Sequence, residues 1–218
     1  MKRCDHLAYT PLEGGRVARK LEINSKPSTG EQMTLVAVAG SGDSELVAHL
    51  LRTMLEQMPH IHVGAITPER SWLRGVELPA GERKGEAFRV QSLLGRMEEE
   101  GCTHVVLQLD DTGLERREYA GLHMSVTALT GPTGHREELA QLLGASDTVV
   151  LNLDERAWED YGGIIPEYTF TYSENKTQAD LTAKNLRLYP SHMEFEAVAV
   201  GHIQRIHLPV PGKRRFPP

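Results

Sequence analysis

Residues 35–45 read LVAVAGSGDSE, and this stretch decides the fold. Its apolar first half predicts a buried strand, and Gly40 and Gly42 predict a tight turn after that strand. Apolar residues then recur at helical spacing, which predicts a helix with one apolar face made of Leu46, Leu50, Leu51, Met54 and Leu55. The order of strand, glycine turn and helix is typical of an α/β fold.

This order is also the layout of a P-loop, in which backbone amides and a helix N-terminus hold phosphate. A working loop adds a lysine for the phosphates and a Ser or Thr for Mg²⁺. Here no lysine occurs between Lys26 and Lys84, and the turn carries Asp43 and Glu45 instead. Two like charges roughly 4 Å apart repel by about 4 kcal/mol at an effective dielectric near 20. We therefore expect a lost or weakened phosphate site, in which the acids satisfy the amides and dipole of the helix.

Composition narrows the class of partner. The chain has 218 residues, a formal net charge of −6 and a pI of about 5.9 without a basic stripe, so we expect no nucleic-acid partner. We find no signal peptide and no long apolar run, so we expect no membrane partner. The two cysteines, Cys4 and Cys102, do not suggest a disulfide framework, which fits a cytoplasmic protein.

Strand and helix patterns alternate after the first 33 residues. Short strands that are apolar on both faces are typical of a parallel sheet covered by helices. We expect strands near residues 34–39, 61–66, 104–109, 123–129 and 147–152, and helices near residues 43–57, 86–100 and 134–144.

After residue 160 the pattern changes to an alternation of period two, which is typical of antiparallel strands. We expect an antiparallel extension over residues 165–209. The predicted fold class is therefore α/β, a mostly parallel, P-loop-like sheet flanked by helices, with a C-terminal antiparallel β extension. We divide the chain into an N-terminal arm (1–33), a core domain (34–212) and a tail (213–218).

Polar side chains follow two of the predicted strands. Asp110 and Asp111 come where α/β proteins bind ligands and Mg²⁺. As an alternative, one of them caps a short helix that begins near Thr112, and we favour this cap because it needs no ligand. Asn152 and Asp154 follow a later strand, where they either hold a nucleotide base or ribose or form an Asx turn.

The sequence predicts no catalytic residues and no metal site. His60 and His62 stand two residues apart at a strand entry, but a zinc site needs three or four ligands and no third one is close in sequence. No nucleophile elbow or Ser-His-Asp spacing occurs. We interpret four other histidines as surface residues or members of pairs: His123, His192, His202 and His207.

The order of these pieces resembles the central ATPase domain of the Mur ligases, over about residues 34–212. Residues 179–188 read ADLTAKNLRL and residues 208–212 read LPVPG, similar to the family's A-D-x-x-A-x-N-I-x-L and L-P-L-P-G stretches. Residues 108–114 and 152–154 fall on its E-V-S-S-H-x-L and N-A-D positions. The branch that the chain resembles most is UDP-N-acetylmuramoyl-tripeptide synthetase, which adds the third residue of the peptidoglycan stem peptide.

The resemblance also indicates which ATP and metal groups are replaced. By position, Ser44 stands for the P-loop lysine and Glu45 for the magnesium-binding threonine. Gln108 stands for a metal-binding glutamate, Gln141 lies near a lysine that the family carbamylates, and His135 matches the histidine of a D-H pair whose aspartate is a glycine here. The resemblance implies a degenerate nucleotide site at Gly40, Ser41, Gly42, Asp43, Ser44, Glu45, Asn152 and Asp154. It implies a residual pocket at Gln108, Asp110, Asp111, His135 and Gln141.

We therefore expect a pseudoenzyme: a cytoplasmic, non-catalytic Mur-ligase homologue with a binding or regulatory role. The alternative is an ATP-binding subunit of an amide ligase that acts with separate chains. We expect no cofactor beyond weak binding of Mg-ATP. The family's two flanking domains have no counterpart in this sequence, which leaves faces of the core for another chain to cover. We expect a homodimer, and a cell-wall synthesis protein is the other candidate partner.

Overall fold

The computed structural model describes residues 33–40, 42–78, 89–155 and 168–209. Ser41, most of the predicted arm 1–33, residues 210–212 and the tail 213–218 lie outside these ranges. The described helices are α1 (Ser44–Glu56), α2 (Arg89–Glu99), α3 (Asp111–Glu115) and α4 (Arg136–Gly144). The described strands are β1 (Thr34–Ala39), β2 (Val63–Ile66), β3 (Ser71–Leu73), β4 (Val76–Leu78), β5 (His104–Leu109), β6 (Met124–Leu129), β7 (Ser146–Asn152), β8 (Thr169–Ser173), β9 (Leu181–Leu188), β10 (Met193–Ala199) and β11 (His202–Leu208).

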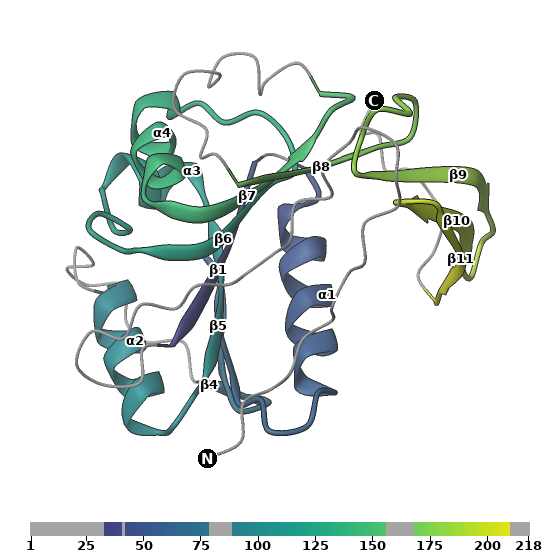
Figure 1. Ribbon diagram of the computed structural model, residues 1–218. Helices are drawn as coiled ribbons and strands as arrows, with labels where there is room; N and C mark the ends of the chain where they lie inside the picture. The colour runs from purple at the N-terminus through teal and green to yellow at the C-terminus, as the bar shows by residue number, and fades with distance from the viewer. Residues whose placement is uncertain (1–32, 41, 79–88, 156–167, 210–218) are drawn as a thin grey trace.

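All of the described strands belong to one sheet, in the order β11-β10-β9-β8-β7-β6-β1-β5-β2-β3-β4 (Figure 1). Strand β1 lies between β5 and β6 and pairs parallel with both. Strands β2 and β7 continue the parallel part on either side. The carboxyl ends of these strands meet at one edge, where ligands bind in open α/β sheets. The predicted mostly parallel sheet is confirmed.

The predicted antiparallel extension is confirmed for β9–β11 and wrong for β8. Strand β8 pairs parallel with β7, and β9 pairs parallel with β8, so on this side of the sheet the antiparallel pairing begins at the β9–β10 pair. The alternation of polar and apolar residues indicates a strand with two unlike faces. It does not indicate whether the neighbouring strand runs parallel or antiparallel. The 153–168 connection has the length that a parallel return requires. The antiparallel β3–β4 hairpin was not predicted, because three-residue strands are too short to show a pattern.

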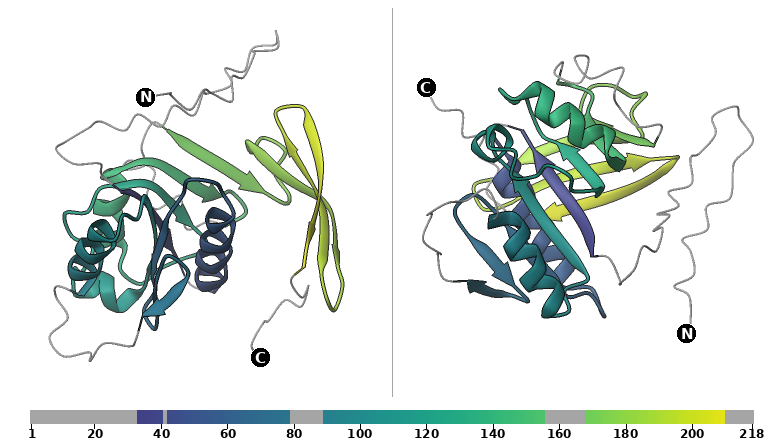
Figure 2. Two further views of the ribbon diagram at one scale, coloured as in Figure 1. Left: turned by 90° about the horizontal axis from the view of Figure 1, so that it is seen from below. Right: turned by 90° about the vertical axis from the view of Figure 1, so that its left-hand side faces the viewer.

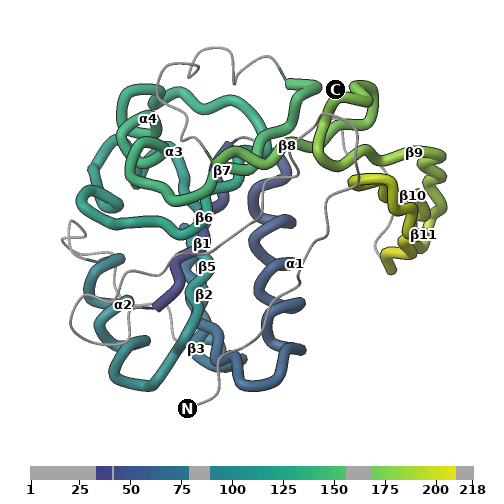
Figure 3. The backbone as a smooth tube through the Cα atoms, viewed as in Figure 1, coloured from purple at the N-terminus to yellow at the C-terminus, as the bar shows by residue number. Residues whose placement is uncertain are grey.

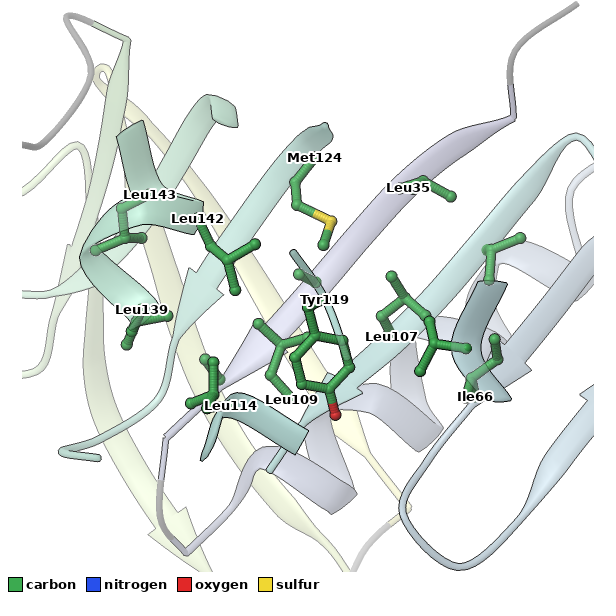
Figure 4. Close-up of a cluster of buried hydrophobic side chains, with 14 of the residues drawn as sticks. Leu35, Ile66, Leu107, Leu109, Leu114, Tyr119, Met124, Leu139, Leu142 and Leu143 are labelled. Atoms are coloured by element: carbon green, nitrogen blue, oxygen red, sulfur yellow. The ribbon is translucent and has the colours of Figure 1, made fainter. Parts of the chain in front are cut away.

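The two faces of the sheet carry separate apolar cores. Helix α1 covers one face, and α2, α3 and α4 cover the other, as the chain path in Figure 3 shows. The α1 core contains Val38, Ala48, Val63, Ala65 and Val106. The larger core on the opposite face joins the three shorter helices to β1, β5 and β6 through buried side chains that include Leu107, Leu114, Met124, Leu139 and Leu143 (Figure 4).

The predicted apolar face of α1 is only partly the buried one. Ser44 and Ala48 are the fully buried positions of this helix, and Leu51 and Leu55 pack beside them. Leu46 and Met54, which were assigned to the same face, are exposed by 45% and 65%. No helix in the described ranges is long and apolar enough to cross a membrane.

The β9–β11 extension stands away from the helix-covered part of the sheet (Figure 2). It contains a β-bulge, because Lys184 pairs with Glu196 while Arg187 pairs with Glu194, which leaves one extra residue on β9. Asn185 lies in this bulge with a φ of 54°. Its Nδ2 donates to Glu196 Oε2 at 2.6 Å, which fixes the bulge across the strand pair.

The turn after β1 depends on Gly40, which has a φ of 116°. A Cβ at this position would lie 2.5 Å from Gly131 N and 2.6 Å from Gly131 O, both backbone atoms of the loop after β6. Thr130 strengthens the approach, since its backbone N and its Oγ1 both donate to Ala39 O, at 2.9 and 3.0 Å. Gly42 also has a positive φ, 90°, but a Cβ there would meet nothing within 4 Å.

These two glycines provide a matched pair of substitutions. Gly42→Ala carries backbone strain alone, and we expect it to lower the free energy of unfolding by about 1 kcal/mol. Gly40→Ala adds a collision with the backbone of Gly131, so we expect a loss of about 3 kcal/mol or more. Urea unfolding followed by circular dichroism measures both values. Equal losses in the two variants would contradict the close approach of the two loops.

Candidate functional site

The start of α1 contacts the end of β5 through two neutral side chains. Gln108 Nε2 donates to Ser44 Oγ at 3.3 Å, and Ser44 is buried. Gln108 Oε1 is also buried, and no atom of the described residues donates to it. An amide and a hydroxyl carry no net charge, so this pair offers Mg²⁺ no anionic ligand. Glu45, the neighbour of Ser44, is exposed.

Asp43 is the N-cap residue of α1, yet its side chain makes no capping hydrogen bond. The expectation that its carboxylate satisfies the helix amides is therefore wrong for Asp43. Burial raises the pKa of Tyr172, on β8, and the negative charges of Glu155, Asp43 and Asp154 raise it further. Three carboxylates thus act on one phenol at the carboxyl edge of the sheet, from the α1 loop and from the end of β7.

Asp110 is the N-cap of α3, so the favoured capping interpretation is confirmed. Its Oδ1 accepts a hydrogen bond from Gly113 N at 3.1 Å and one from the Tyr119 hydroxyl at 2.9 Å. A Cβ on Gly113 would lie 2.5 Å from the Tyr119 hydroxyl oxygen, so this ring requires a glycine there. Burial, followed by the charge of Asp110, raises the pKa of Tyr119 and keeps its proton on this bond.

Asp111 and His135 lie near one another through Thr133. The Thr133 hydroxyl donates to Asp111 Oδ1 at 2.5 Å and accepts from the backbone N of His135 at 3.3 Å. His135 is the N-cap of α4 and makes no side-chain capping bond. Gln141 is exposed on α4, on the face of the sheet opposite α1. Of the five residues grouped as a residual pocket, Asp111 and His135 share Thr133, Gln108 and Asp110 share the Tyr119 hydroxyl, and Gln141 lies apart from them on α4.

Asn152 and Asp154 form the Asx turn that was one of the two interpretations, since Asp154 N donates to Asn152 Oδ1 at 3.0 Å. Asp154 then accepts from Ser173 Oγ at 2.7 Å and from Glu174 N at 2.6 Å. Lys176 Nζ donates to Leu153 O at 2.5 Å in the same region. Burial opposes ionisation of Asp154, but these hydrogen bonds outweigh it and lower the pKa of the carboxyl.

A cavity of about 520 Å³ lies between α1 and the β3–β4 hairpin. Gln108 and Glu45 line it, so it adjoins the loop after β1. The Arg52 guanidinium lies 4.9 Å from the centre of the Trp72 ring and binds Glu56 at 2.7 Å. This cavity was not predicted from the sequence, nor was most of its polar lining: His49, Arg52, Thr67, Glu69, Arg70, Trp72 and Glu77. Only the cluster Arg70-Ser71-Trp72 after Pro68 could have pointed to it.

The fold of this chain is similar to that of solved Mur ligases. A solved UDP-N-acetylmuramoyl-L-alanyl-D-glutamate–2,6-diaminopimelate ligase matches with a TM-score of 0.70 at 17% identity, over 82% of this chain and 39% of that one. This likeness shows the fold. No protein-family model matches the chain.

Curated relatives extend the likeness to the sequence. A ligase of the same name from Corynebacterium glutamicum is 32% identical over 113 residues, 52% of this chain and 21% of the relative. Another from Parabacteroides distasonis is 26% identical over 91 residues, 42% of this chain and 18% of the relative. This chain is Mur-ligase-like in sequence and in fold, as the motifs indicated. It spans about a fifth of the length of these curated relatives.

The pKa of Asp154 generates a prediction about stability in acid. Because its folded pKa is below the ordinary value of 3.8, ionised Asp154 stabilises the fold above that pH, and this contribution is lost as pH falls through the folded pKa. We expect Asp154→Asn to lower the free energy of unfolding by about 1–3 kcal/mol near neutral pH. The gap to the wild type should shrink below about pH 4.

Asp147→Asn is the matched control, because Asp147 forms an exposed pair with His123 at 3.0 Å. We expect it to cost less than about 1 kcal/mol. Urea unfolding at a series of pH values measures both variants. A loss for Asp154→Asn that stays constant down to pH 2–3 would contradict the hydrogen-bonded carboxylate.

Proposed function

We propose that the chain is a non-catalytic Mur-ligase-like protein that does not bind Mg-ATP tightly. The observation that carries the proposal is Asp43, a carboxylate at the start of the helix where a P-loop requires a cation. Its charge adds to those of Asp154 and Glu155 around Tyr172. A triphosphate at this edge would meet anions, and Gln108 would offer its Mg²⁺ an amide.

The Ser44–Gln108 hydrogen bond supports a second assignment of the loop. The Ser or Thr of a P-loop binds Mg²⁺ and follows a glycine and a lysine. Ser44 is the hydroxyl that faces β5, whereas Glu45 is exposed, so Gly42-Asp43-Ser44 fits Gly-Lys-Ser/Thr with Asp43 in place of the lysine. The ungapped alignment to the family instead puts Ser44 at the lysine. The two assignments predict different repairs of the site.

Calorimetric titration with Mg-ATP tests the proposal. We expect a dissociation constant weaker than about 1 mM, which corresponds to a binding free energy of about −4 kcal/mol. A micromolar constant for the wild-type chain would contradict it and favour an ATP-binding ligase subunit.

Two double variants then separate the loop assignments. Asp43→Lys with Gln108→Glu restores a cation and a carboxylate around Ser44, and we expect it to strengthen Mg-ATP binding at least about tenfold, or 1.4 kcal/mol. Ser44→Lys with Glu45→Thr restores the ungapped alignment, and we expect no gain because it places a lysine in a buried position. The opposite ranking would reject the second assignment.

We further propose that the cavity beside α1 is the binding site of this protein. Its lining mixes basic side chains (His49, Arg52 and Arg70) with carboxylates (Glu45, Glu69 and Glu77), around Trp72. Such a lining suits a zwitterionic or amide-bearing ligand. The curated relatives are named for a muramoyl dipeptide and diaminopimelate, so a fragment of a peptidoglycan precursor is the ligand class that we propose.

A titration with diaminopimelate or a muramoyl dipeptide, followed by nuclear magnetic resonance, should shift the Trp72 indole signal. Shifts confined to other residues would contradict this site.

We also propose that the protein is a cytoplasmic homodimer. The described thiol, Cys102, is free and buried, which fits a reducing compartment. Strand β11 is an edge strand with Ile203 exposed by 68%, and edge strands invite pairing with another chain. Light scattering after size exclusion should report twice the monomer mass, and Ile203→Lys should reduce it. A monomer mass for the wild-type protein at high micromolar concentration would contradict the dimer.

A further inference from the structure

The β9–β11 extension brings together two histidines and a glutamate that lie apart in the sequence. His192 directly precedes β10, Glu194 lies two residues further on, and His207 is the cross-strand partner of Glu194 on β11. Residues two apart on a strand share a face, and so do directly paired residues on neighbouring strands. The hairpin register therefore places all three side chains on one face of the extension.

The ligand atoms of this cluster are already close to the separation of a metal site. Glu194 Oε1 lies 3.8 Å from His192 Nε2 and 3.6 Å from His207 Nδ1. The three ligand atoms all lie within 4.8 Å of one another. Two ligands of a tetrahedral ion with bonds near 2.1 Å are about 3.4 Å apart. Small side-chain rotations would bring these atoms into coordinating positions.

Neighbouring rings fix the position of His192, whereas the exposed ring of His207 can still adjust. The His192 ring stacks on Tyr189 at a centroid distance of 4.3 Å and on His207 at 4.6 Å. The His207 side chain is 58% exposed, so its ring can tilt without disturbing a core. Arg205 shares this face and binds Glu196 at 3.5 Å, so Glu196 offsets its charge. Arg187 and Lys184, on β9, lie opposite Glu194 and Glu196 in the strand register.

We propose that His192, Glu194 and His207 bind a divalent transition metal of the Zn²⁺ class. Two imidazoles and a carboxylate suit Zn²⁺, Co²⁺, Ni²⁺ or Cu²⁺, whereas Mg²⁺ prefers oxygen ligands. Three protein ligands leave one position of a tetrahedral ion for water or an external group. The bound ion also links the turn before β10 to the end of the edge strand β11. The site is separate from the α1 loop and does not depend on the function proposed for it.

Titration of the untagged full chain with ZnCl₂ and with CoCl₂ tests the site. Calorimetry should show one Zn²⁺ per chain with micromolar affinity, undiminished by excess Mg²⁺. Bound Co²⁺ should give visible absorption without a thiolate charge-transfer band. Such a band would assign the metal to a cysteine, and binding that survives in the His192→Ala/His207→Ala variant would assign it to other ligands; either result would overturn the proposal. Binding only at millimolar Zn²⁺ would also overturn it.

Single variants separate ligation from folding. Glu194→Gln keeps the size of the side chain, and we expect it to weaken Zn²⁺ binding at least about tenfold. We expect the same loss from His192→Ala and from His207→Ala. His123→Ala is the matched control, because it removes a histidine that contacts a carboxylate, Asp147 at 3.0 Å, and the described residues place no third metal ligand beside that pair. Its Zn²⁺ affinity should equal that of the wild type. Circular dichroism confirms the fold of each variant, and unchanged affinity in a folded Glu194→Gln would reject the site.

Discussion

The approach of two backbone segments, at Gly40 and Gly131, is the constraint on which the arrangement of this protein depends. Strand β1 lies between two parallel neighbours, so the chain that leaves it must turn within the space above the end of β6. A residue without a Cβ allows that turn, and the two bonds from Thr130 to Ala39 O fasten it. Helix α1 can then descend on one face of the sheet while α4 descends on the other, and the carboxyl edge becomes a common site.

Several polar residues at this edge hold the fold together, although the Mur-ligase resemblance assigns them to ligand binding. Asp110 caps α3 and binds Tyr119, and Asp154 joins the end of β7 to the turn after β8. Gln108 binds Ser44, as a neutral pair between β5 and α1. Hydrogen-bonded carboxylates and amides of this kind stabilise the fold without a ligand. Such positions can therefore be polar without contacting a ligand.

Local signals account for what could be predicted from the sequence. The strands and helices of the parallel part follow from runs of buried residues, and the α3 cap follows from the position of Asp110 after β5. Contacts between distant residues could not be predicted in this way. The Ser44–Gln108 bond spans 64 residues, and the direction of β8 depends on a connection rather than on its own residues.

The cluster of His192, Glu194 and His207 on the extension also depends on a contact between residues that are distant in the sequence. His192 and Glu194 are two apart, but His207 joins them only when the register of the β10–β11 hairpin is known. That register follows from the tight turn at Val200 and Gly201, whose φ angles in the structure are 48° and 80°. Pairing outward from this turn places His207 opposite Glu194. The bulge at Asn185 has no comparable signal, since asparagine is common in many turns.

The narrow pairing between β8 and β9 divides one sheet into two cooperative units. Two residue pairs join these strands, Tyr172 with Leu181 and Ser173 with Thr182, while β10 pairs along its length with both neighbours. Two bonds from Thr171 to Asp180 add a side-chain clasp at the same place. The junction between the extension and the parallel part thus rests on few hydrogen bonds. The backbone amide hydrogens of the extension should exchange with solvent when the extension opens locally. Those of β1, β5 and β6 should exchange only when the whole chain unfolds.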